Sequence, residues 1–145
     1  MAFGRACCEH GMKTYFLKAS ELNQKFTEAR GLDRTGNVMK SLVKPSCLII
    51  DEIGRCTFDK ENTRLFFDLI DRRYSKEGPN CMIFTSNKQP ESWQEYFNED
   101  SSLLCSLDRI FDVASVFTIK GESYRGRNLE TFHVEAGSTP ASTYK

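Results

Sequence analysis

The sequence lacks a long apolar run and an excess of charge of either sign. No apolar stretch approaches the roughly 20 residues that a membrane-spanning helix needs, and the first ten residues lack the apolar core of a secretory signal. The 20 basic and 20 acidic residues cancel, so the chain as a whole has no net field that attracts nucleic acid or an anionic membrane. We therefore expect a cytoplasmic protein that does not enter a membrane, in which any nucleic-acid site is a local patch.

Six cysteines are present, but their positions do not indicate a disulfide framework. Cys47 and Cys81 lie inside apolar runs and Cys7 lies in a helical pattern, where a thiol acts as a small hydrophobic side chain. The nearest approach to a metal-binding cluster is Cys7, Cys8 and His10, which lacks a second Cys or His pair at zinc-site spacing. We expect reduced thiols that pack in the core.

The apolar residues alternate between strand and helical periods along a chain of single-domain length. Apolar runs predict strands at 14–17, 47–50, 81–84 and 113–119. Helical spacing predicts helices at 2–10, 20–29, 38–43, 59–74, 90–97 and 101–110. Parallel neighbours need crossover connections, which are helices here, so the sequence predicts an α/β fold with a mainly parallel sheet and flanking helices.

For two of these strands the sequence also predicts burial on both faces of the sheet. The runs at 47–50 and 81–84 are continuously apolar, which is typical of strands buried on both faces. After residue 125 the periodicity is lost, and residues 126–145 are expected to form a tail without fixed structure.

The run at 47–50 ends in two adjacent carboxylates, Asp51 and Glu52. They lie at the carboxyl end of a predicted strand, where ligands bind to parallel sheets. One carboxylate of such a pair can hold Mg²⁺ on a triphosphate, and the next can polarise an attacking water. Asp is also common where a strand leads into a polar turn, so the pair alone is a weak motif.

Further polar residues follow the later strands. Thr85, Ser86 and Asn87 are expected to emerge at the same sheet edge, beside the acids. The neutral amide of Asn87 can orient a water or a γ-phosphate without the repulsion of a carboxylate, although Ser and Asn also favour turns and helix caps. Arg109 and Arg125 are either solvated surface charges or partners for phosphate oxygens, which a guanidinium binds in bidentate fashion.

The order and spacing of six segments resemble the IstB/DnaC group of AAA+ ATPases, which are transposition helpers and replicative helicase loaders. The segments are ACCEHGMKTYFLKASEL near the start, LIIDEIG at 48–54, LFFDLIDRRY at 65–74, FTSN at 84–87, SWQEYF at 92–97 and LDRIFDVASVFTIKGESYR at 107–125. The resemblance covers about residues 2–125. We therefore expect a partial AAA+ ATPase domain at 1–125, followed by the tail at 126–145.

The resemblance implies a role for each candidate residue. Asp51 would be the Walker B acid that holds Mg²⁺, and Glu52 would be the base that activates water. Asn87 would be the sensor 1 residue that reads the γ-phosphate. Arg109 would be the arginine finger offered to the nucleotide of a neighbouring subunit, and Arg125 is similar to the arginine near sensor 2.

The resemblance also implies cofactors and partners. The cofactors would be ATP and Mg²⁺, with ATP held between the subunits of a homo-oligomer in the full-length form. The partners would be double-stranded DNA and a transposase or a replicative helicase.

The sequence contains no glycine-rich phosphate loop of the GxxGxGK(S/T) type, which family members carry before the helix that begins this chain. The backbone amides and the lysine of that loop make most of the triphosphate contacts, so we expect weak ATP binding by this chain alone. The P-loop NTPase core would also lack its first strand. We hypothesise that the chain is the carboxyl-terminal part of a longer ATPase, or the product of a truncated reading frame.

These observations favour an ATP-binding and ATP-hydrolysing helper protein of DNA transposition. The segments IIDEIG, TSN with SWQEYF, and KGESYR are more similar to IstB than to helicase loaders. The alternatives are a helicase-loader-like replication protein and a non-catalytic remnant that binds DNA or a partner. Four basic positions form either a DNA-binding patch or a solvated surface: Arg72, Arg73, Lys76 and Lys88.

Overall fold

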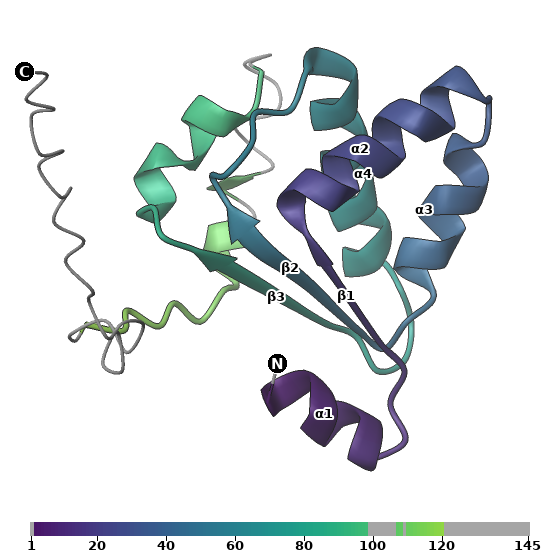
Figure 1. Cartoon of the computed structure of the whole chain (residues 1–145). Coiled ribbons are helices and arrows are strands. Elements are labelled where there is room, and N and C mark those ends of the chain that lie inside the picture. Colours follow the sequence, from purple (N-terminus) through teal and green to yellow (C-terminus); the bar gives the residue numbers. More distant parts are fainter. Residues whose placement is uncertain (1, 99–106, 109, 121–145) are drawn as a thin grey trace, which may run out of the picture. The chain divides into compact units, whose positions relative to one another are not determined.

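The computed structural model describes residues 2–98, 107–108 and 110–120 (Figure 1). The chain divides into two compact units, Met1–Ser115 and Val116–Lys145, and every helix and strand named below belongs to the first. Arg109, Arg125, most of the helix predicted at 101–110 and the predicted tail at 126–145 lie outside the described residues. Within the described part, no helix combines the length and apolar character needed to cross a membrane.

Three parallel strands form the sheet, in the order β1 (Thr14–Lys18), β2 (Cys47–Ile53) and β3 (Cys81–Ser86). The first residues of the strands are in register, because Cys47 pairs with Thr14 on one side and with Cys81 on the other. The carboxyl ends of all three strands therefore meet at one edge. The predicted α/β fold with a parallel sheet is confirmed.

Helices lie on both faces of the sheet (Figure 1). One face is covered by α2 (Ala19–Gly31), α3 (Thr35–Val43) and α4 (Lys60–Tyr74), and the opposite face is covered by α1 (Ala2–Glu9). After β3 the chain forms a 3-10 helix, η1 (Pro90–Tyr96), with the predicted proline in its first turn.

The central strand β2 packs against both layers. Leu48 and Ile50 join the main core under α2, α3 and α4, whereas Cys47 and Ile49 form a smaller cluster with Cys7 of α1. Successive side chains of a strand point to opposite faces, so the continuous apolar run supplies both cores. The predicted burial of 47–50 on both faces is confirmed.

Two strand predictions are wrong. The run at 81–84 was expected to be buried on both faces, but these residues of β3 are only half-buried. Among the described residues β3 pairs with β2 alone, so one of its edges has no neighbouring strand. The strand expected at 113–119 is not formed, since residues 114–120 have no regular secondary structure. The physical reason is that this apolar run has no partner strand in the described part of the chain.

Arg73 is a structural residue rather than part of a basic surface. Its guanidinium is fully buried, and its two terminal nitrogens donate to four carbonyls, those of Leu42, Val43, Pro45 and Cys81. Lys76 Nζ also donates to the carbonyl of Pro45, at 2.9 Å. The last carbonyls of a helix lack helical partners, so these two cations satisfy the end of α3 and join it to α4 and β3.

Candidate functional site

The carboxyl ends of β2 and β3 bring the two predicted acids together with Thr85. Asp51 and Glu52 are half-buried residues near the end of β2, and the Thr85 hydroxyl on β3 donates to the Asp51 carboxylate. Asn87 lies one residue beyond β3 and is exposed. The structure thus places the acids beside Thr85, near the end of β3, as the sequence predicted. The chemical roles of Asp51, Glu52 and Asn87 stay predictions.

Glu52 has a strained backbone. Its φ of 60° lies in the left-handed region, which a residue with a side chain occupies at a cost of about 1–3 kcal/mol. The strain coincides with an irregularity in the pairing of β2 with β3, between Ile50 and Ile53. Local strain of this kind clusters at functional sites, where the surrounding structure maintains it. The outlier therefore supports a functional reading of the acid pair.

Two basic side chains contact the Glu52 carboxylate. Lys18 Nζ, at the end of β1, lies 3.3 Å from Oε2, and Arg55 Nη2 lies 3.6 Å from Oε1. Both cations are about half exposed, so their effect on stability is small. Sequence reasoning missed both residues. Lys18 could have been found, because it directly follows the strand predicted at 14–17, and the structure pairs it with Asp51.

The donor set at this edge fits a magnesium ion that arrives with a nucleotide. In the part of the chain that is described, no group of three or more His, Cys, Asp or Glu side chains is arranged to hold a metal. Mg²⁺ does not need such a cage, because it is commonly bound by one or two carboxylates together with substrate phosphates and water. Asp51, whose carboxylate is oriented by the hydroxyl of Thr85, can supply one such ligand.

Helix α1 runs in the direction opposite to the strands (Figure 1). Gly4 approaches Ile49 so closely that an added Cβ would lie 3.1 Å from Ile49 Cδ1, whereas Cys7 packs against Cys47. Helix α1 and strand β2 therefore run antiparallel, and α1 packs on the amino-terminal half of β2.

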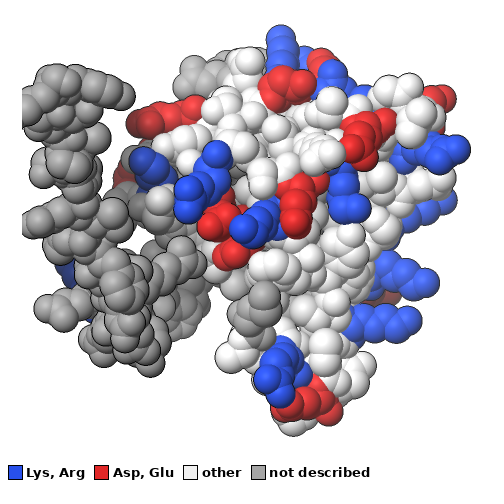
Figure 2. Space-filling view, viewed as in Figure 1, with Lys and Arg blue, Asp and Glu red and all other residues white. Residues whose placement is uncertain are grey.

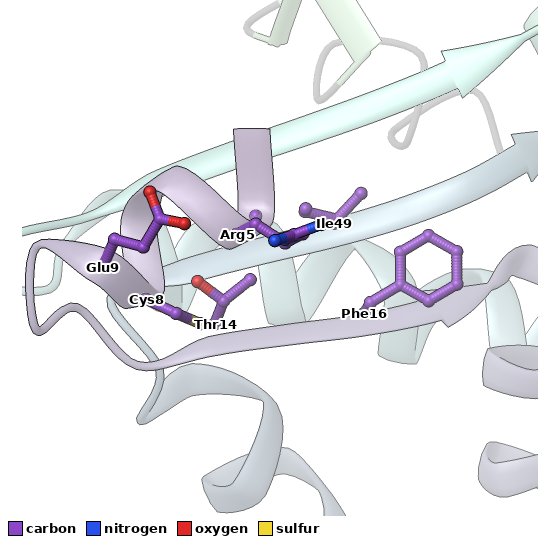
Figure 3. A pocket seen from close by; sticks show the side chains of 7 residues that line it. Arg5, Cys8, Glu9, Thr14, Phe16 and Ile49 are labelled. Carbon is purple, nitrogen blue, oxygen red and sulfur yellow. The ribbon is translucent and has the colours of Figure 1, made fainter. Parts of the chain in front are cut away.

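A recess of about 340 Å³ lies on the α1 side of the sheet (Figure 3). Figure 3 shows Arg5, Cys8 and Glu9 of α1 around it, with Thr14, Phe16 and Ile49 of the strands. Its lining is mainly apolar and includes none of the predicted site residues. The recess is therefore separate from the acid pair.

Three of the four basic positions that were candidates for DNA binding have hydrogen-bond partners within the protein, and Nζ of the fourth, Lys88, lies 6.0 Å from the centroid of the Tyr96 ring. Arg72 Nε bonds the Asp68 carboxylate at 2.9 Å, and Arg73 and Lys76 bind backbone carbonyls. Burial lowers the pKa of Arg73, as expected for a cation removed from water. Acidic and basic side chains lie side by side on the face seen in Figure 2. The solvated-surface interpretation therefore suits Arg72, whereas Arg73 is buried and contributes to no surface patch.

Comparison with known proteins identifies relatives of the chain. The family model described as "IstB-like ATP binding protein" matches residues 1–131. The ATP-binding protein named for insertion sequence IS232 of Bacillus thuringiensis subsp. berliner is 38% identical over 124 residues, which cover 86% of this chain and 48% of that protein. The one named for IS5376 of Geobacillus stearothermophilus is 36% identical over 130 residues, covering 88% and 49%. The chain thus spans about half the length of these relatives.

Solved structures share the fold. DnaA from Aquifex aeolicus, bound to AMPPCP, matches with a TM-score of 0.60 at 14% identity, over 72% of this chain and 31% of that chain. A replication initiator DnaA bound to AMPPCP and single-stranded DNA matches with a TM-score of 0.61 at 13% identity. At such identity the likeness shows the fold alone. Because the family model covers most of the sequence, the chain belongs to the IstB-like ATP-binding proteins.

Proposed function

We propose that this chain carries the Mg²⁺-binding and water-activating residues of an ATP-hydrolysing helper protein of DNA transposition, and that by itself it binds ATP weakly. The observation that carries the proposal is the distorted end of β2, where Asp51 and the strained Glu52 lie at the carboxyl edge of a parallel sheet.

Each predicted residue has a part in this proposal. Asp51 would hold Mg²⁺, and the ion would neutralise charge on the triphosphate when it is bound. The Glu52 carboxylate accepts a proton from the water that attacks the γ-phosphorus, and ADP departs with its β-phosphate oxygen as the leaving group. Asn87, just after β3, hydrogen-bonds the γ-phosphate or the water.

The remaining roles concern assembly. Arg109 would reach the nucleotide of a neighbouring subunit in a homo-oligomer, and Arg125 would contact the phosphates of its own nucleotide. The relatives are named for insertion sequences, which supports a transposase and double-stranded DNA as partners, in the cytoplasm. A role as a loader of a replicative helicase is the second candidate. The resemblance to DnaA does not favour it, because at 14% identity it concerns the fold alone.

Nucleotide binding measured with and without Mg²⁺ tests the proposal. Fluorescent ATP is titrated against the wild-type chain, Asp51→Asn and Glu52→Gln, up to millimolar concentrations. We expect Mg²⁺-dependent binding by the wild type and its loss in Asp51→Asn. Glu52→Gln should bind ATP while its hydrolysis falls by about 10²–10⁴-fold, the usual contribution of a general base.

Asp68→Asn is the matched control, because Asp68 is an exposed acid on α4 whose partner is Arg72. It should bind and hydrolyse ATP as the wild type does. Equal binding by Asp51→Asn and the wild type, or no Mg²⁺-dependent binding by the wild type, would overturn the proposal.

A further inference from the structure

The hydroxyl of Thr85 lies between the two acids and bonds to both of them. Its Oγ1 accepts a hydrogen bond from the backbone N–H of Glu52 at 3.0 Å. The same hydroxyl donates its proton to the Asp51 carboxylate. A threonine hydroxyl has one donor and two acceptor positions, so it can make both bonds at once. One exposed side chain on β3 thus contacts the two residues on which the proposed chemistry depends.

The need for this hydroxyl arises from a bulge in β2. Ile50 pairs with Phe84 and Ile53 pairs with Ser86, so two residues of β2 lie opposite the single residue Thr85. An extra residue in one strand disrupts the ladder and leaves backbone groups to find other partners. The N–H of Glu52 finds the Thr85 side chain, which replaces the missing backbone acceptor.

A second hydroxyl acts at the other end of the bulge. Ser86 Oγ donates to the carbonyl of Ile53 at 2.7 Å. The two neighbouring hydroxyls of β3 therefore bind Asp51, Glu52 and Ile53, the residues of the bulge in which Glu52 has its left-handed φ. The φ of Glu52 sets the direction in which its side chain leaves the strand. The hydrogen bonds of Thr85 and Ser86 therefore affect the position of the Glu52 carboxylate, which Lys18 and Arg55 also contact.

We propose that Thr85 is a positioning residue of the site. Its hydroxyl maintains the bulge, directs the Asp51 carboxylate toward the metal position and directs Glu52 toward the water position. The proposal rests on the proposed function for its consequence in hydrolysis. In this proposal Thr85 contacts neither the nucleotide nor the water, and it acts through Asp51 and Glu52.

Two substitutions separate the hydroxyl from the shape of the side chain. Thr85→Val removes the hydroxyl and keeps the β-branched form that suits a strand, whereas Thr85→Ser keeps the hydroxyl. Thr57→Val is the matched control, because Thr57 is an exposed threonine outside the helices and strands.

Amide hydrogen exchange at Glu52, followed by NMR on the chain without nucleotide, tests the geometry. In Thr85→Val the Glu52 N–H should exchange faster by about tenfold or more, since its acceptor is gone. Thr85→Ser and Thr57→Val should exchange at the wild-type rate. Equal exchange in Thr85→Val and the wild type would overturn the proposal.

Steady-state hydrolysis tests the consequence. In Thr85→Val we expect kcat to fall by about 10–100-fold, as when an outer partner of a metal-binding group is removed. Thr85→Ser should recover most of the rate, which a general loss of folding would not predict. An unchanged kcat in Thr85→Val would overturn the proposal. Failure of the wild type to hydrolyse ATP would count against the proposed function, and the exchange result would then decide the role of Thr85.

Discussion

Lys18 Nζ lies 3.3 Å from Oε2 of Glu52, so a cation that ends β1 meets an acid of the neighbouring strand β2. The contact exists because parallel strands in register bring their carboxyl ends to one edge. It is a half-exposed ion pair beside the proposed nucleotide position, where it holds the Glu52 carboxylate toward β1.

Removing this ion pair should have little effect on stability. We expect Lys18→Met to change the free energy of unfolding by less than about 1 kcal/mol, because water screens exposed pairs. A double-mutant cycle with Glu52→Gln in urea unfolding should give a coupling of about 0.2–1 kcal/mol that decreases with added salt. Lys25→Met, at an exposed position of α2, is the control for replacing a lysine. A coupling several times larger would show that the pair holds the site together.

Gly54, just after the acids, should not tolerate a side chain. Its φ is 92°, and an added Cβ would lie 2.9 Å from Lys88 Cγ. We expect Gly54→Ala to destabilise the protein by about 1 kcal/mol or more in thermal or urea unfolding. Gly36→Ala should do the opposite and stabilise by about 0.5–1 kcal/mol, because Gly36 lies in α3 with nothing within 4 Å of an added Cβ. Equal effects of the two substitutions would contradict this prediction.

Arg72 and Arg73 are adjacent in the sequence and should differ strongly when replaced. Arg73→Met removes the donor to the carbonyls of Leu42, Val43 and Cys81 and one of the two donors to Pro45, so we expect the free energy of unfolding to fall by about 3 kcal/mol or more. Arg72→Met removes only an exposed pair with Asp68 and should cost less than about 1 kcal/mol. Urea unfolding measures the free energy of unfolding of both variants. A similar decrease in the two variants would refute the assigned role of Arg73.

Cys47 should make the protein sensitive to alkali. Burial raises the pKa of its thiol from 9.0 to about 12, with the neighbouring thiols of Cys81 and Cys7 as further causes. The folded state therefore keeps the proton that the unfolded state loses. The resulting stability is fully present below pH 9.0 and is lost as the pH rises toward about 12.

For the wild type, the urea concentration at the midpoint of unfolding should be lower above pH 9.0 than at neutral pH. Cys47→Ala lowers the midpoint at neutral pH through lost packing, and its further decrease in alkali should be smaller. A thiol reagent provides a second measurement, because exposed Cys8 should react long before buried Cys47. Similar rates for the two thiols in the folded protein would contradict the prediction.

Much of the fold was predictable because its signals are local. The helical spacing at 59–74 and the continuous apolar run at 47–50 both correspond to elements of the structure. The cap of α4 also follows from its sequence, since the Asp59 side chain accepts from the N–H of Asn62 at 2.7 Å. Such features depend on residues within one or two turns of each other.

The errors concern features that depend on distant residues. The apolar run at 113–119 has the composition of a strand, yet a strand forms only where a neighbour can pair with it. In LFFDLIDRRY the sequence around Arg73 predicts a surface charge. Its burial requires carbonyls from the end of α3, about 30 residues earlier, and from β3. Local patterns carry no information about such partners.

The same division applies to the candidate site. The sequence by itself determined that Asp51 and Glu52 end a buried strand and that the residues after 84 emerge beside them, because parallel strands share their direction. Tertiary structure alone decided that β2 bulges opposite Thr85, that Glu52 turns left-handed and that Lys18 meets its carboxylate. The physical reason is that register, backbone strain and ion pairing are settled only when three separate strands lie side by side.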